Sequence, residues 1–178
     1  MKRKTRYVLL GLLRVENLTG YEIKKIIDTR MSFFWQESYG QIYPELNALL
    51  KEDYIFEVRY DDKENSGHEK IKYAITDKGV KELKFWMEAE NEKESTRSEF
   101  FLKMYLSTDE NSTDMKRHIE EFYDRSQLQL EMFRKIEAQL IEHVDIHSNH
   151  RQILNVLSLG IKQQELYCNW SKQLLEIM

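Results

Sequence analysis

The spacing of apolar residues predicts helices followed by a β-hairpin in the first 90 residues. Ile23, Ile26 and Ile27 form one apolar stripe behind Thr19, which a glutamate follows three residues later as in a capping box. Further on, two stretches rich in β-branched and aromatic residues flank a polar, turn-rich loop, and such a hairpin needs helices to pack on. The predicted elements are helices at 7–14, at 19–30, near Pro44 and at 78–90, and strands at 54–60 and 71–76.

The only proline, Pro44, stands among Ile42, Leu46, Leu49 and Leu50, which are apolar residues at helical spacing. Proline lacks an N–H group, so a helix tolerates it near its start, where the first N–H groups have no intrahelical partner. We therefore expect a short helix whose first turn lies close to Pro44. Its outer face is polar and could contact a binding partner.

A polar stretch at 89–97 separates this region from a strongly helical second half. After an apolar helix that begins at residue 98, apolar positions alternate in steps of four and three, typical of heptads. A last helix runs to the end of the chain, and two long helices bury more apolar surface if a second copy joins them. We predict homodimerisation, the alternative being an intramolecular hairpin that closes on its own. The seam positions are 115, 119, 122, 126, 129, 133, 136 and 140.

The predicted fold is mainly α with a small β-hairpin wing, in two domains. Three helices, a hairpin and a fourth helix match a winged helix-turn-helix domain at 1–90, whose third helix can enter a major groove. Residues 98–178 form the helical dimerisation domain. Charged residues make up 33% of the chain and proline is nearly absent, which also suits a helix-rich protein.

Charge is distributed unevenly between the two halves. Residues 1–85 hold 16 Lys and Arg against 14 Asp and Glu, a balance of +2, whereas the remaining residues hold 11 against 17, a balance of −6. The first 25 residues contain seven basic residues and two acidic ones. A basic N-terminal arm suits contact with phosphate, although it could also serve only to keep the terminus soluble.

Composition and motifs exclude several classes of function. No apolar run approaches the length of a membrane span, and the single Cys168 cannot form an internal disulfide, so we expect a cytoplasmic protein. No catalytic triad order, glycine-rich phosphate loop or paired cysteine set is present, and we expect neither an enzyme nor a cofactor. His143, His147 and His150 have a spacing that can hold zinc, but histidines also suit a helix C-terminus, and we predict no metal.

The outer face of the helix around Pro44 carries groups that can read DNA. Gln41 and Asn47 have amides able to pair bidentately with adenine, and Tyr43 could contact a phosphate or a thymine methyl. Glu45 conflicts with this interpretation, because phosphates repel a carboxylate unless it accepts a hydrogen bond from cytosine. An ordinary solvated amphipathic helix is the alternative.

Three segments, "TGYEIKKII", "IYPELNALLKEDYI" and "KYAITDKGVKEL", resemble in order and spacing the PadR family of bacterial transcriptional regulators. The tyrosine-proline pair is that family's mark. The resemblance implies dimeric repressors on an inverted repeat, with recognition helices about 34 Å apart. It also implies, in some members, a small aromatic or drug-like effector that releases the DNA. The chain departs from the pattern at Asn47 and Ala48, where basic residues are common, and at Asp53, where glycine is usual.

The sequence predicts two candidate sites, one for DNA and one for a small effector. Aromatic residues near the junction of the halves could receive a flat apolar effector, or they could be core. The rival interpretation of the whole protein is a winged-helix module that binds protein, favoured by Glu45 and a wing of mixed charge. The predicted DNA contacts are Lys4, Ser38, Gln41, Tyr43, Asn47, Lys63, Lys70 and Lys72. The predicted effector residues are Trp35, Trp86, Phe101, Tyr105 and Trp170.

Overall fold

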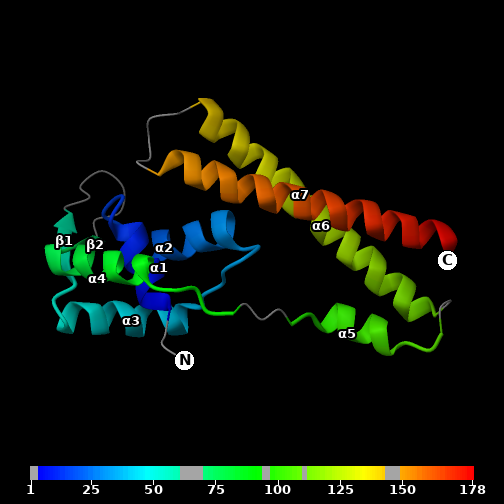
Figure 1. The fold of residues 1–178 in the computed structure, drawn as a ribbon, viewed down its shortest axis with the longest axis horizontal. Coiled ribbons are helices and arrows are strands. Elements are labelled where there is room, and N and C mark those ends of the chain that lie inside the picture. The colour runs from blue at the N-terminus through cyan, green and yellow to red at the C-terminus, as the bar shows by residue number, and fades with distance from the viewer. Residues whose placement is uncertain (1–3, 61–69, 94–96, 110–111, 143–148) are drawn as a thin grey trace. The chain divides into compact units, whose positions relative to one another are not determined.

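The computed structural model describes residues 4–60, 70–93, 97–109, 112–142 and 149–178 (Figure 1). Backbone contacts divide the chain into two compact units, residues 1–91 and 92–178. Among the described residues, no helix combines the length and the apolar character that crossing a bilayer requires. In chain order the elements are α1 (Thr5–Leu13), α2 (Gly20–Ile26), the π-helix η1 (Ile27–Met31), α3 (Tyr39–Lys51), β1 (Ile55–Tyr60), β2 (Lys70–Ile75), α4 (Asp77–Glu88), α5 (Glu99–Leu106), α6 (Thr113–Glu142) and α7 (His150–Ile177).

The N-terminal unit has one hydrophobic core, to which α1, α2, α3, α4 and the hairpin contribute. Burying each of these aliphatic side chains stabilises the unit by about 1.5–3 kcal/mol. The predicted capping box is confirmed: the Thr19 hydroxyl accepts the Glu22 N–H at 3.1 Å, and the Glu22 carboxylate accepts the Thr19 N–H at 2.7 Å. The fully buried core residues are Leu9, Leu10, Ile23, Ile27, Ile42, Leu46 and Leu49.

The predicted hairpin is present, and it contacts both the segment between α1 and α2 and the helix α4. β1 and β2 pair antiparallel, with Ile55 opposite Ile75. The segment between α1 and α2 adds a short bridge, in which Leu18 and Tyr73 exchange backbone hydrogen bonds of 3.2 and 2.8 Å. Where the hairpin meets α4, the Gly79 backbone lies so close to the Tyr54 carbonyl that a Cβ would come within 2.3 Å of it. Only glycine fits there, so the sheet and α4 are held in close contact.

The helix around Pro44 begins earlier than the sequence pattern predicts. Its N-cap is Ser38, so Pro44 is the sixth residue of α3 and lies in its second turn. At that position proline removes the hydrogen bond that the Gly40 carbonyl would otherwise accept. The first turn of α3 thus lies close to Pro44, as predicted, but it starts at Ser38 and ends before the proline. The backbone N–H of Ser38 donates a hydrogen bond to the Gln41 side-chain oxygen.

In the C-terminal unit, α6 and α7 pack against each other along the predicted seam. Four seam positions of α6 are buried, and those of α7 follow the same alternation of three and four residues. An ion pair of 2.8 Å between Arg134 and Glu165 joins the two helices. The seam is therefore filled within one chain, so it does not by itself require a second copy. The buried residues are Ile119, Ser126, Phe133 and Leu140 on α6, and Leu157, Gly160, Ile161, Gln164, Cys168 and Ser171 on α7.

Candidate nucleic-acid interface

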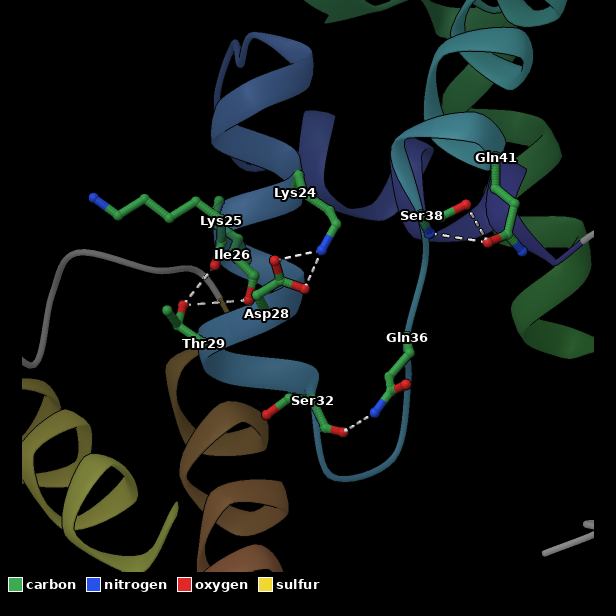
Figure 2. Close-up of polar contacts among 9 residues, drawn as sticks. All are labelled: Lys24, Lys25, Ile26, Asp28, Thr29, Ser32, Gln36, Ser38 and Gln41. Carbon is green, nitrogen blue, oxygen red and sulfur yellow. Dashed lines mark hydrogen bonds and ion pairs between the residues drawn. The ribbon is translucent and has the colours of Figure 1, made fainter. Parts of the chain in front are cut away.

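The helices α2 and α3, with η1 and a loop between them, form the helix-turn-helix (Figure 1). The π-helix continues α2 after Ile26, and the Thr29 hydroxyl donates to the Lys25 carbonyl at 2.8 Å (Figure 2). Lys24 pairs with Asp28 across the same turn, and the Gln36 amide donates to the Ser32 carbonyl at 3.4 Å. These local bonds shape the turn that leads into α3.

The two faces of α3 differ sharply in chemistry. Ile42, Leu46 and Leu49 are fully buried in the core, which fixes the roll of the helix about its axis. The opposite face is exposed and carries the predicted contacts Gln41, Tyr43 and Asn47. Between residues 38 and 50 the only charged residue is Glu45, so the exposed face offers amide and phenol groups up to its last turn, where Lys51 adds a cation.

The predicted contacts Ser38 and Gln41 are engaged with each other at the start of α3. The Gln41 side-chain oxygen accepts from the Ser38 N–H at 2.9 Å and from its hydroxyl at 2.8 Å (Figure 2). A bidentate contact from Gln41 to adenine needs that oxygen as well as the amide nitrogen. The arrangement therefore assigns Gln41 chiefly to capping α3, and it leaves Asn47 as the exposed amide not tied to the cap.

Glu45 is buried, whereas the sequence-based interpretation placed its carboxylate beside DNA phosphates. Its side chain is only 5% exposed and pairs with Arg6 of α1 at 3.1 Å. The same guanidinium contacts Glu52 at 3.1 Å. Burial lowers the pKa of Arg6, but its hydrogen bonds to Glu45 and Glu52 outweigh this, and the pKa is raised overall. The carboxylate is neutralised inside the unit, and Arg6 of the basic arm is used for structure.

Two tyrosines stand together on the exposed side of α3. The rings of Tyr39 and Tyr43 stack at 6.0 Å between centroids, and both side chains are close to half exposed. The Lys24 ammonium lies 5.7 Å from the centroid of the Tyr39 ring, within the range of a cation–π contact. The helices α2 and α3 thus share one surface made of aromatic rings and a cation.

The predicted cationic contacts outside α3 are only partly described. Lys72 on β2 lies 3.8 Å from Glu22, so α2 and the hairpin share an ion pair there. Lys4 caps α1 with its carbonyl, which accepts the N–H of Tyr7 at 3.0 Å. Lys63 falls outside the described residues, and Lys70 is described only by its backbone at the start of β2.

The five predicted effector residues belong to two different units. In the N-terminal unit, Trp86 stacks on Tyr7 at 4.6 Å, and the Trp35 indole donates to Glu37 at 2.9 Å. In the C-terminal unit, Tyr105 is 87% exposed, whereas Phe101 and Trp170 join an aromatic cluster. That cluster, with ring centroids 4.4–6.2 Å apart, consists of Phe100, Phe101, Phe122, Tyr167 and Trp170.

A polar groove lies between α6 and α7, and sequence reasoning did not anticipate it. It has a volume of about 390 Å³ and includes the Arg134–Glu165 ion pair. Burial raises the pKa of the Cys168 thiol at its wall, so this thiol is protonated at neutral pH.

Of the histidines whose spacing could hold zinc, His143 and His147 lie outside the described residues. Within the described part of the chain, no three His, Cys, Asp or Glu side chains are grouped to hold a metal ion.

Two family models match the chain, one on each unit. "Transcriptional regulator PadR-like family" matches residues 9–85, and "Virulence activator alpha C-term" matches residues 96–178. The N-terminal unit thus matches the PadR-like family. The first match spans α2, α3 and the hairpin, and so includes the surface described above.

Similar proteins agree with this assignment over the full length. The negative transcriptional regulator PadR of Bacillus subtilis is 29% identical, covering 99% of this chain and 98% of the relative. A PadR-like regulator of Bacillus cereus is 29% identical with a TM-score of 0.81, covering 99% of this chain and 96% of that one. B. subtilis PadR in complex with operator DNA, at 24% identity, has the same fold with a TM-score of 0.80, covering 100% and 99%. The B. subtilis protein has also been solved with p-coumaric acid, at 25% identity and a TM-score of 0.70, covering 98% of each chain.

Proposed function

We propose that this PadR-like protein is a transcriptional repressor that binds double-stranded DNA through α3 and the hairpin. The observation that carries the proposal is the exposed face of α3, which presents Tyr43 and Asn47 and no carboxylate, because Glu45 is buried against Arg6. The burial of Glu45 also removes one argument for the protein-binding alternative. A relative named as a negative regulator, and the same fold seen on operator DNA, support the proposal.

We further propose that the C-terminal unit forms a homodimer, as DNA binding at an inverted repeat requires. Because the α6–α7 seam is closed within the chain, the dimer would use the other face of α7. Val156, Leu159 and Leu166 are 43–64% exposed there, although they are apolar, and their spacing continues to Ile177. Two copies joined in this way would place their α3 helices in successive major grooves, about 34 Å apart.

A small aromatic effector is the third part of the proposal. The aromatic cluster of the C-terminal unit offers Phe101 and Trp170, and the complex of the B. subtilis protein with p-coumaric acid supports this ligand class. Trp35, Trp86 and Tyr105 stay candidates on the sequence argument alone. A regulator of this kind would act in the cytoplasm and would catalyse no reaction.

DNA binding is tested by selecting duplexes from a randomised library with the purified protein, followed by fluorescence anisotropy at two salt concentrations. We expect enrichment of an inverted repeat, whose binding weakens with salt. Asn47→Ala should weaken binding to the selected duplex by about 1–3 kcal/mol and leave random DNA unaffected, because base contacts carry specificity. Gln139→Ala, an exposed amide on α6, is the matched control. A folded protein that enriches no sequence would contradict the proposal and favour the protein-binding module.

A further inference from the structure

The Tyr43 ring of α3 packs directly against a glycine of α2. Gly20 is the first residue of α2, and a Cβ placed on it would lie 2.8 and 2.9 Å from two ring carbons of Tyr43 and 3.1 Å from its hydroxyl. The three nearest atoms all belong to Tyr43. The ring of the recognition helix therefore occupies the space that any side chain at position 20 would take.

Nothing else at Gly20 requires glycine. Its backbone is not in the left-handed region, and in a helix alanine is more favourable than glycine. The residue before it, Thr19, provides the cap through its own hydroxyl, which a methyl group at position 20 does not remove. On backbone grounds alone, alanine at this position would leave the fold intact.

The Tyr43 ring also has an aromatic neighbour. The Tyr39 ring stacks on it at an interplanar angle of 22°, and Lys24 of α2 lies over Tyr39. Tyr43 thus packs near both Gly20 and Tyr39 although 44% of its surface is exposed. A side chain with two packing neighbours loses less conformational entropy when it contacts a ligand.

We propose that Gly20 is a positioning residue for DNA recognition. Because it has no side chain, it leaves a space in which the Tyr43 ring packs, and this packing holds Tyr43 in its DNA-contacting orientation before DNA binds. This inference rests on the proposed function. A larger residue at position 20 displaces the ring, because the exposed tyrosine moves more easily than the backbone of two packed helices. The displaced hydroxyl then has to be reoriented at the cost of affinity.

The test is a double-mutant cycle with Gly20→Ala, Tyr43→Ala and the double variant, measured by anisotropy on the selected duplex. We expect Gly20→Ala to lower affinity by about five- to tenfold in the wild-type background and by less than about twofold beside Tyr43→Ala. Gly11→Ala is the matched control, because a Cβ on that helical glycine meets no atom within 4 Å. Equal losses in both backgrounds, or no loss at all, would overturn the inference.

Two further measurements separate a positioning role from a structural one. Thermal unfolding of Gly20→Ala should match that of Gly11→Ala, and a large drop in the midpoint found only for Gly20→Ala would overturn the inference. In NMR spectra of protein labelled in its tyrosine rings, Gly20→Ala should shift the Tyr43 resonances without any DNA. Unshifted resonances would show that Gly20 does not position the Tyr43 ring. If the wild-type protein enriches no duplex, the proposed function fails, and these ring spectra still decide whether Gly20 positions Tyr43.

Discussion

At the scale of single residues, the contact between Arg6 and Glu45 shows how a carboxylate is accommodated within a recognition helix. Glu45 is buried beside Leu46 and Leu49, where an unpaired charge would be costly. Arg6 supplies the opposite charge from α1, while its contact with Glu52 lies nearer the surface. The pair fastens α1 to α3 and keeps negative charge away from the exposed face.

Arg6→Ala should lower the free energy of unfolding by about 1–3 kcal/mol, because it leaves Glu45 buried without its partner. The loss is smaller than for a fully buried pair, since the Arg6 side chain is 23% exposed. Glu52→Ala is the control and should cost less than about 1 kcal/mol, as exposed pairs do. Urea unfolding measures both, and equal effects of the two variants would show that Glu45 does not depend on Arg6.

At the scale of elements, the end of α3 explains a departure from the family pattern. Asp53, where a glycine is usual, has a φ of +57°, in the left-handed region. Aspartate tolerates this region better than most residues, but glycine enters it without steric strain. The Thr76 hydroxyl, donating to the Asp53 carbonyl at 2.8 Å, holds the turn that starts the hairpin.

Asp53→Gly should stabilise the N-terminal unit by about 0.5–1 kcal/mol, because it relieves the left-handed backbone. Asp53→Ala, the control, should destabilise it, since alanine enters the left-handed region less readily than either glycine or aspartate. Chemical denaturation compares the three proteins. If glycine and alanine had the same effect, backbone conformation would not govern this position.

Elements were predicted well from sequence where the signal was local. The capping box at Thr19, the paired strands and the heptad seam each depend on residues a few positions apart, and all three are present. The π-helix at Ile27–Met31 was missed because no residue there differs from an ordinary helical pattern. The first turn of α3 was predicted close to Pro44, but its first residue was not, because the signal used was Pro44, whereas Ser38 and Gln41 make the cap.

At the scale of the whole molecule, the two units have separate interiors. The core of the first is built from aliphatic residues of α1 to α4, and that of the second from the α6–α7 seam around Phe133. Cys168, the only cysteine, lies in the second unit and is 8% exposed. Its buried, protonated thiol reacts slowly, so its reaction with a disulfide reagent reports opening of that unit alone.

Phe133→Ala should destabilise the C-terminal unit by about 3–5 kcal/mol, because a fully buried aromatic side chain is replaced by a cavity. The thiol of Cys168 should then react faster with a disulfide reagent at neutral pH. Leu46→Ala, which removes an equally buried side chain from the N-terminal unit, is the control and should leave the thiol rate near that of the wild type. Equal acceleration by both variants would show that the two units unfold together.

The candidate sites were less accessible to sequence reasoning than the fold. Glu45 and Arg6 are 39 positions apart, and Gly20 and Tyr43 are 23 apart, so neither contact leaves a local pattern. The predicted effector residues come from both units, as a site at the junction of the halves would require, and this site stays a prediction. Residue type indicated which chemistry was available, and packing decided which side chains could use it.

The exposed face of α3 between Ser38 and Leu50, which carries no cation, also separates two kinetic properties of a regulator of this type, the rate of search along DNA and the residence time at a site. Sliding along non-specific DNA depends on cations near the phosphates, and between Ser38 and Leu50 there are none. Substitutions on this face would therefore change how long the protein stays at a site, not how fast it searches the chromosome. A lineage of such proteins could acquire a new operator by altering Tyr43 or Asn47 while its search rate stayed the same.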